Sequence, residues 1–464
     1  MTLRTPLSIL LAALPVLAEP SLPYSRDTAA RLIGDVITDP LVFGRLAHLT
    51  DSVGPRLSGG SGHARAVEWT AAQLKADGVE VRLEKVMVPH WVRGEETAAV
   101  VASQGRVEQP LSLTALGGSA GTPEGGLEAE VVMVRSVEEA AALGEKARGR
   151  IVFFQGMMKQ SRDYGAGSTL RVRGPAAAAS QGAVAALVRS AATASFRSPH
   201  TGVTLFDKGQ PIPAAAVSTE DADLLERLIT AGAGPVRVRL KLGCKTLPDV
   251  ESANVVAELK GREKPDEIVL LGGHLDSWDL ATGAIDDGAG VAMVMAALRG
   301  LARLPQHPRR TVRVVLFANE ENGSRGSRGY RAAHAAELAR HVAAIEMDAG
   351  AGRATSISAP NAPAVLGPWI GREGPLAGLG VTDLDDGGHG GADIGGLAED
   401  AQVPMVDVNQ EGSRYFDIHH SAADTLDKVD PQQLRQAAAT VAWVAYALAE
   451  MPGTLDRRPP KPRR

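Results

Sequence analysis

The stretch from Leu270 to Asp287 constrains the fold of this chain more than any other. An apolar run ends there at two glycines, and the chain continues with His274, a leucine and Asp276. An apolar run that stops at glycine is typical of a buried strand ending in a turn. Because open α/β sheets bind ligands at the carboxyl ends of their strands, the His-x-Asp pair is a candidate metal site.

His274 and Asp276 complement each other chemically. One imidazole nitrogen can bind a metal ion, while the carboxylate two residues later accepts a hydrogen bond from the other nitrogen and fixes the ring. Asp286 and Asp287 follow, directly before a glycine and a long apolar segment that predicts a helix. Since the helix dipole stabilises carboxylates at its N-terminus, a double N-cap is the alternative interpretation of this second pair.

Further His and carboxylate side chains follow other predicted strands or precede the last predicted helix. Taken singly, each would more often be a cap, a turn residue or a surface histidine. Gathered at one edge of a sheet, the carboxylates would repel one another unless cations lay among them. Nitrogen and oxygen ligands without thiolate favour zinc. The residues are Glu320 and Glu321 after the apolar run 312–317, Asp348 after the run 342–347, and His419 and His420 in a loop.

Strands and helices alternate regularly in the second half of the chain, which predicts an α/β fold. The pattern indicates a three-layer αβα sandwich, in which helices cover both faces of a central mixed, mostly parallel sheet. The expected strands are residues 252–258, 267–273, 311–318, 341–347 and 403–408, and the expected helices are residues 289–304, 324–338 and 431–451.

Residues 95–245 differ in pattern from the rest of the chain. They consist mainly of short β-like runs broken by Gly and Pro. The segments on either side, residues 19–94 and 246–451, form one continuous α/β pattern when these residues are removed. We therefore expect a smaller, β-rich α/β domain inserted at a surface loop of the larger domain. Residues 452–464 are rich in Pro and basic side chains, which predicts a disordered tail.

The N-terminus predicts export. Residues 1–18 contain a basic residue, a short apolar run and small residues at the usual cleavage positions, as in a secretory signal peptide. We therefore expect a secreted or periplasmic protein, and no other apolar run is long enough to span a bilayer. The formal net charge of −5 gives no indication of binding to nucleic acid or to anionic membranes. The single cysteine, Cys244, excludes an intramolecular disulfide framework.

Several of these motifs together resemble the co-catalytic di-zinc aminopeptidases, and within them the carboxypeptidase Q (plasma glutamate carboxypeptidase) group. The likeness covers most of the chain, from about Asp27 to Met451, so it is specific. It implies that the inserted region is a protease-associated domain, and members of the family often form homodimers. The motifs are Gly-Gly-His-Leu-Asp-Ser-Trp-Asp at residues 272–279, Asp286-Asp287, Glu320-Glu321, Glu346-Met-Asp348, His419-His420-Ser421, Val53 to Gly59, and Ser198 to Gly202.

The resemblance implies two zinc ions per chain, with Asp286 shared between them. His274 and Asp348 would complete the ligands of one ion, and Glu321 and His420 those of the other. Four carboxylates, including that of the neighbouring general base, would balance the four positive charges of the two ions. In family members the peptide bond that follows the shared aspartate is cis, and we expect the same bond here.

The resemblance also assigns catalytic roles. Glu320 would be the general base that takes a proton from water, and Asp276 would orient His274. Many members of the wider clan have a tyrosine immediately before the last zinc-binding histidine, whereas this chain has His419 at that position. The donor to the oxyanion is therefore open, with His419 and Tyr415 as candidates.

These features together predict a secreted di-zinc metallo-exopeptidase that hydrolyses dipeptides or other short peptides with a free N-terminus. Two alternatives are a catalytically inactive binding protein on a peptidase scaffold and a one-zinc acyltransferase of the glutaminyl cyclase type. The complete two-metal ligand set and the presence of Glu320 argue against both. The turn from Pro199 to Gly202 is a candidate contact for the far end of the peptide.

Overall fold

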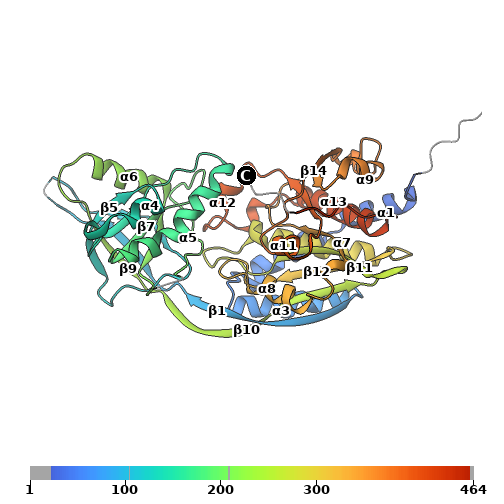
Figure 1. Ribbon diagram of the computed structural model, residues 1–464, viewed down its shortest axis with the longest axis horizontal. Helices are drawn as coiled ribbons and strands as arrows, with labels where there is room; N and C mark the ends of the chain where they lie inside the picture. The colour runs from blue at the N-terminus through green and yellow to red at the C-terminus, as the bar shows by residue number, and fades with distance from the viewer. Residues whose placement is uncertain (1–21, 104, 207–208, 460–464) are drawn as a thin grey trace, which may run out of the picture.

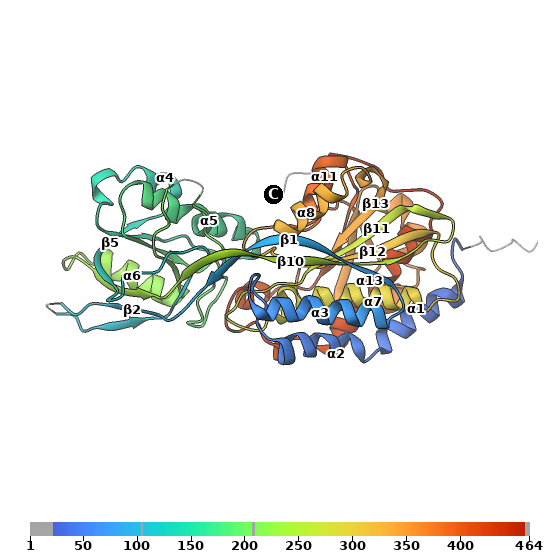
Figure 2. The same ribbon diagram turned by 90° about the horizontal axis from the view of Figure 1, so that it is seen from below.

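Two long antiparallel strands, β1 (Glu80–Val92) and β10 (Lys245–Leu259), run between the two lobes of the molecule (Figures 1 and 2). They pair along their whole length, with one irregularity next to Pro89. Proline has no N–H to give to a neighbouring strand, so it is tolerated at such a break in the ladder. The first lobe comprises residues 22–92 and 245–459, and the second lobe comprises residues 96–242.

The structure is a computed structural model that describes residues 22–103, 105–206 and 209–459. The predicted signal peptide, residues 1–18, lies outside the described residues. Among the residues described, no helix has the length and apolar character needed to cross a membrane.

The first lobe is built on an eight-stranded mixed sheet in the order β1-β10-β12-β11-β13-β16-β14-β15. The inner strands β12, β11, β13 and β16 are parallel to one another, and β14 is also parallel to β15; the other pairs are antiparallel. The additional strands are β11 (Lys264–His274), β12 (Arg310–Phe317), β13 (His341–Glu346), β14 (Ala354–Ala359), β15 (Asp383–Asp386) and β16 (Met405–Gln410).

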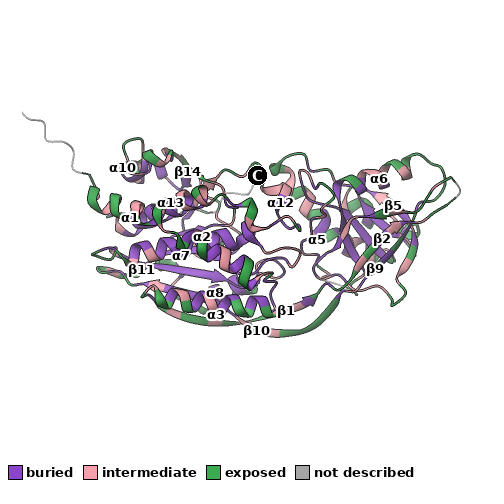
Figure 3. Ribbon diagram, turned by 180° about the vertical axis from the view of Figure 1, so that it is seen from behind, coloured by how far each residue is buried: buried purple, intermediate pink, exposed green. Residues whose placement is uncertain are grey.

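Helices cover both faces of this sheet, and the sequence pattern of the strands explains why. Successive residues of a strand point to opposite faces, so a strand that is apolar at every position is buried on both. In β11, Val269 and Leu271 pack with helices α1, α7 and α13, whereas Leu270 packs with α8 and α11 on the other face. Figure 3 shows α7 as buried almost throughout, and β11 is buried from Ile268 to His274. These layers confirm the predicted αβα fold class.

The first lobe combines the longer helices α1, α3, α7 and α13 with several helices of nine residues or fewer. The long helices α7 and α13 begin and end within two residues of their predicted bounds. The helices are α1 (Arg26–Thr38), α2 (Leu41–Ala47), α3 (Ser61–Ala76), α7 (Ala289–Ala302), α8 (Arg325–Ala333), α9 (Ala362–Val365), α10 (Gly367–Ile370), α11 (Gly395–Ala401), α12 (Tyr415–Ile418) and α13 (Pro431–Glu450).

The second lobe has its own eight-stranded sheet, in the order β3-β2-β9-β5-β6-β7-β8-β4, with β5 to β8 parallel. Its apolar core also receives Leu57 and Trp278 from loops of the first lobe. The strands are β2 (Glu96–Val100), β3 (Gln109–Leu111), β4 (Leu113–Ala115), β5 (Leu127–Val134), β6 (Ile151–Phe154), β7 (Ala185–Arg189), β8 (Ala214–Val217) and β9 (Arg237–Leu242), and the helices are α4 (Val137–Ala141), α5 (Tyr164–Ser180) and α6 (Thr219–Thr230).

The end of the described chain differs from the disordered tail that its composition predicts. Leu455 is buried, and the guanidinium of Arg457 donates hydrogen bonds to the carbonyls of Ala339, His341 and Ala401. Residues 452–459 therefore lie against the first lobe, because one apolar side chain and the backbone acceptors hold them there. Residues 460–464 lie outside the described residues.

Candidate metal centre

His274 stands at the end of β11 and is almost completely buried. Its Nε2 lies 3.1 Å from Oδ1 of Asp286 and 3.7 Å from Oδ1 of Asp348. One ligand atom from each of these three residues lies within 4.8 Å of the others. The structure thus brings together the first ligand set that the resemblance implies.

His420 faces the opposite side of Asp286. Its Nε2 lies 3.2 Å from Oδ2 of Asp286 and 3.0 Å from Oε2 of Glu321, so the second implied set also converges. His419 is a further candidate here, because its Nε2 is 3.6 Å from the same Oδ2 of Asp286. The two histidine rings are stacked with their centroids 3.5 Å apart. Asp286 therefore lies between two groups of metal-binding side chains.

The chemistry of these groups fits divalent cations. Burial would raise the pKa of Asp286, but His274 and His420 hold it well below its usual range. Burial lowers the pKa of both histidines, yet Asp286 and Asp348 raise that of His274, and Glu321 raises that of His420, well above the usual value. Oδ2 of Asp286 is buried and accepts no well-aligned hydrogen bond among the described residues. Imidazole nitrogens and carboxylate oxygens are ligands that zinc takes in proteins, so a divalent cation can take the place of the protons that these groups share.

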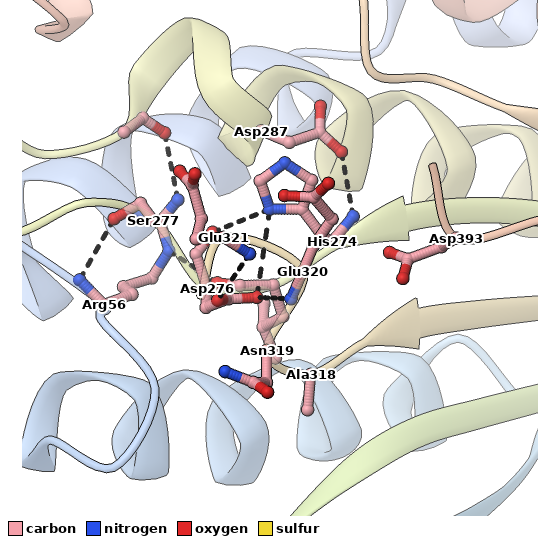
Figure 4. Close-up of polar contacts among 12 residues, drawn as sticks. Arg56, His274, Asp276, Ser277, Asp287, Ala318, Asn319, Glu320, Glu321 and Asp393 are labelled. Atoms are coloured by element: carbon pink, nitrogen blue, oxygen red, sulfur yellow. Dashed lines mark hydrogen bonds and ion pairs between the residues drawn. The ribbon is translucent and has the colours of Figure 1, made fainter. Parts of the chain in front are cut away.

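Asp276 is fully buried and contacts His274 through its backbone carbonyl more closely than through its carboxylate (Figure 4). The Nδ1 atom of His274 lies 3.0 Å from the backbone carbonyl of Asp276, whereas the nearer carboxylate oxygen is 3.9 Å away. The carboxylate instead accepts hydrogen bonds from the backbone N–H groups of Glu320, at 3.0 Å, and Glu321, at 3.4 Å. Asp276 therefore orients His274 through its carbonyl and fixes the Glu320–Glu321 turn through its side chain.

Asp287 has the capping role that was the alternative for the Asp286–Asp287 pair. Its carboxylate accepts hydrogen bonds from the backbone N–H groups of His274, at 3.0 Å, and Gly290, at 3.1 Å. The peptide bond between Asp286 and Asp287 is cis, as the resemblance implies. The two aspartates thus diverge: Asp287 caps the start of α7, and Asp286 points to the histidines.

Arg56 was not predicted to be a site residue, although the motif from Val53 to Gly59 that contains it was part of the resemblance. It is fully buried and donates hydrogen bonds to the carbonyls of Leu275, at 2.9 Å, Thr282, at 2.6 Å, and Gly283, at 2.9 Å. Burial lowers its pKa, and Asp424 offsets part of that effect. Arg56 holds the loop that leads from His274 to Asp286.

Comparisons with known proteins identify the family of this chain. Residues 254–445 match the family described as Peptidase family M28. The chain is 38% identical over 420 residues to carboxypeptidase Q of Mus musculus, which covers 89% of this chain and 87% of that protein. With carboxypeptidase Q of Homo sapiens the identity is 38% over 421 residues, covering 89% and 86% of the two chains. This chain belongs to peptidase family M28.

A solved structure extends the similarity to the fold. The crystal structure of a Peptidase M28 precursor from Shewanella amazonensis is 39% identical, with a TM-score of 0.87, and the match covers 94% of this chain and 99% of that one. An aminopeptidase from an Aneurinibacillus strain shares the fold at 21% identity, with a TM-score of 0.64 over 93% and 98% of the chains. Membership of the M28 peptidases confirms the resemblance and the predicted enzyme class, a zinc-dependent exopeptidase.

A cleft of about 820 Å³ opens in front of the two groups of candidate metal-binding side chains, and residues of both lobes line it. Glu320 lies in its wall beside Asp348. Burial raises the pKa of Glu320 well above its usual range, and Glu321 and Asp348 add to the effect. A cation among these carboxylates would oppose that shift. Glu320 is therefore placed to exchange a proton with a molecule in the cleft.

His419 and Tyr415, the two candidates for the oxyanion donor, both line the cleft with their rings 5.0 Å apart. Burial and then His420 hold the pKa of His419 well below its usual range, so its imidazole is neutral. Burial and Asp286 raise the pKa of Tyr415 well above its usual range, so its hydroxyl keeps its proton. Each can donate one neutral hydrogen bond.

The turn from Pro199 to Gly202 does not face the cleft in the way predicted for a peptide contact. His200 and Thr201 are completely buried, and the carbonyl of Thr201 faces His420 instead. Val203 and Leu205, just beyond the turn, line the cleft. The hydroxyl of Thr201 donates to the carbonyl of Ala115 at 2.8 Å, whereas neither ring nitrogen of His200 has a hydrogen-bond partner among the described residues. The neighbouring apolar residues face the space where a substrate would lie.

Proposed function

We propose that this M28 peptidase is a co-catalytic di-zinc exopeptidase that removes residues from dipeptides and other short peptides with a free N-terminus. The observation that supports it is the position of Asp286, which has a histidine and a second carboxylate on each side. A carboxylate shared in this way suits two neighbouring ions. A site for one zinc, as in the glutaminyl cyclase alternative, would not need the second group.

His274, Asp286 and Asp348 would hold one zinc ion, and Asp286, Glu321 and His420 the other. When bound, the ions supply Lewis acidity for the attacking water and for the carbonyl of the scissile bond. Asp276 and Arg56 keep the loops that carry these ligands in place. The second alternative, an inactive binding protein, is disfavoured because Glu320 lies in the wall of the cleft beside the ligands.

Glu320 is proposed as the general base. It takes a proton from the attacking water as the new C–O bond forms, and then gives that proton to the leaving amine as the C–N bond breaks. His419 or Tyr415 donates a hydrogen bond to the oxygen that becomes negative during the attack. The Asp276 carboxylate serves this step indirectly, because it holds the backbone of Glu320.

The proposed preference for a free N-terminus rests on the charge of the cleft. Asp286, Glu320, Glu321 and Asp348 line it, and carboxylates favour an ammonium group. The second lobe narrows the cleft, since Tyr164 and Leu205 also line it. We interpret residues 95–245 as an inserted protease-associated domain, and the protein as secreted or periplasmic. By analogy with the family, a homodimer is its expected assembly.

The test is metal analysis combined with a substrate panel. Purified protein should contain close to two equivalents of zinc, lose activity to a chelator and regain it with zinc. Free dipeptides should be cleaved faster than N-acetylated dipeptides, long peptides or a denatured protein. One tightly held equivalent with full activity would exclude the co-catalytic site, and faster cleavage of the acetylated peptides would exclude the proposed substrate class.

A further inference from the structure

The two proposed metal positions are supported by different parts of the molecule. Around the first, His274 is held by the carbonyl of Asp276 and by the carboxylate of Asp287, and Asp348 follows β13. All of these groups belong to the first lobe. The second position differs, because two of its ligands contact residues that belong to, or pack inside, the second lobe.

The first of these contacts joins His420 to Thr201 of the second lobe. The backbone N–H of Thr201 donates to the carbonyl of His420 at 2.8 Å, and the carbonyl of Thr201 lies 3.2 Å from Nδ1 of His420. When Nδ1 donates its proton to that carbonyl, Nε2 has a free lone pair, which is the form that binds a metal ion. Nη1 of Arg171 also lies 3.3 Å from this Nδ1, but a guanidinium cannot accept a proton, so the Thr201 carbonyl is the acceptor that stabilises the ligand tautomer of His420.

Arg171, on α5 of the second lobe, fixes the Thr201 carbonyl. Its side chain is buried, with Nη1 donating to that carbonyl at 2.8 Å and Nη2 donating to the hydroxyl of Tyr164 at 3.1 Å. Gly202 makes room for it, because a Cβ at that position would lie 2.1 Å from the guanidinium carbon. The planar guanidinium thus spans two acceptors in one geometry.

The second contact concerns Glu321. Its Oε1 accepts a hydrogen bond from the backbone N–H of Trp278 at 3.2 Å. The indole of Trp278 belongs to the apolar core of the second lobe, where it packs against Gly117. The position of this backbone donor is therefore tied to the packing of the second lobe.

We propose that the second lobe sets the affinity of the metal position formed by Asp286, Glu321 and His420, with Arg171 as the positioning residue that acts through Thr201. The inference rests on the proposed di-zinc function. It assigns the second lobe a part in building the metal centre, in addition to covering the cleft. The position formed by His274, Asp286 and Asp348 is independent of this contact.

The positive charge of Arg171 predicts the opposite change in metal affinity. The direction of the measured change therefore distinguishes an effect of charge from an effect of positioning. A cation close to His420 repels a metal ion, so its removal would strengthen binding if charge dominated. Loss of the hydrogen bond to the Thr201 carbonyl would instead weaken binding, because outer ligand partners usually contribute about 10–100-fold to metal affinity. We expect the positioning effect to be the larger one.

The experiment is a zinc titration of the metal-free full chain against a competing chelator. Arg171→Gln should leave the first equivalent unchanged and weaken the second by about 10–100-fold. Arg171→Lys, which keeps the charge and one donor, should fall between Arg171→Gln and the unaltered protein. Arg173→Gln is the matched control, because Arg173 lies on the same helix and is exposed. Cobalt in place of zinc gives a second readout, since the visible absorption of the second equivalent should change only in the Arg171 variants.

A second equivalent that binds Arg171→Gln as tightly as the unaltered protein, or more tightly, would overturn the inference. In that case the unaltered protein would still hold two zinc ions, and the proposed function would stand. If the unaltered protein holds only one, both fail together. Should Arg171→Gln not fold, Arg171→Lys serves instead, because it keeps the charge but not the fork of donors that spans the Thr201 carbonyl and the hydroxyl of Tyr164. It should weaken the second equivalent alone, and equal binding would again overturn the inference.

Discussion

The two sheets of this peptidase have similar parallel strands at their centres, but different chemistry at the ends of those strands. In the first lobe, β11 ends at His274, β12 is followed by Glu320 and Glu321, and β13 is followed by Asp348. In the second lobe, β5 to β8 end in residues that take no part in the ligand groups. Their common architecture therefore does not determine where the metal centre lies.

The difference lies in how the charges are paired. At the end of β6, Gln155 donates to Glu226 of α6 at 2.7 Å, and Arg135 forms an ion pair with the same carboxylate. Arg189, at the end of β7, pairs with Asp223. The second lobe thus pairs the charged side chains at its strand ends with one another.

At the corresponding edge of the first lobe, no Lys or Arg of the described residues forms an ion pair with Asp286, Glu320, Glu321 or Asp348. Buried carboxylates without such partners are costly unless a cation compensates them. At this edge the ion-pair partners of Asp286, Glu321 and Asp348 are histidines, which can bind a metal ion together with the carboxylates once they lose their extra proton.

The largest expected effect is on kcat, and it separates a carboxylate at the edge of the first sheet from one at the edge of the second. Glu320→Gln should lower kcat by about 10²–10⁴, because it removes the proposed general base, while both zinc ions remain bound. Glu226→Gln, the same change at the strand ends of the second lobe, should leave kcat unchanged. Steady-state kinetics and metal analysis of the two variants check this. If Glu320→Gln keeps its rate but loses a metal ion, the roles of Glu320 and Glu321 have been exchanged.

Much of the first edge could be predicted from the sequence, because its ligands directly follow apolar runs. The glycines after Leu271 mark the end of β11, and His274 follows at once. The edge strands β14 and β15 were missed, since Ser, Thr and Asp give them no apolar run. The continuation of β1 past Pro89 could not be predicted either, because a proline ordinarily ends a strand pattern.

The contacts that hold the ligands could not be predicted in the same way. The Asp276 carboxylate reaches the backbone of Glu320, which lies 44 residues away in the chain. Thr201 and His420 are 219 residues apart, and neither carries a pattern that points to the other. Such partners depend on how loops from different strands meet in space, which local periodicity does not encode.

The next largest effect is on the free energy of unfolding, and it concerns an ion pair near the contact between the lobes. Arg93, at the end of β1, forms a bidentate ion pair with Asp279 of the loop that follows His274, and also donates to the carbonyl of Ala115 at 2.6 Å. The side chains of Arg93 and Asp279 are 9% and 26% exposed. Arg93→Ala should therefore lower the free energy of unfolding by about 2–3 kcal/mol, less than the cost of breaking a fully buried pair.

Chemical denaturation measures this effect, and Arg239→Ala is the control. Arg239 pairs with Glu108 on the surface of the second lobe, where both side chains are about half exposed. Its loss should change the free energy of unfolding by less than about 1 kcal/mol. Equal effects of the two substitutions would mean that the Arg93 pair contributes no more than a surface pair.

The smallest effect concerns the packing of Trp278 in the second lobe. A Cβ on Gly117 would lie 2.2 Å from the indole ring, so Gly117→Ala forces the ring to move. We expect a loss of about 1–2 kcal/mol, in the lower part of the range for overpacking, because a ring on a loop can shift. Gly125→Ala is the matched control, since a Cβ on Gly125 would meet no atom within 4 Å.

Because the backbone N–H of Trp278 donates to Glu321, Gly117→Ala should also weaken binding of the second zinc equivalent while Gly125→Ala does not. Destabilisation with unchanged zinc affinity would separate the packing of Trp278 from the metal centre, and would restrict the influence of the second lobe to His420.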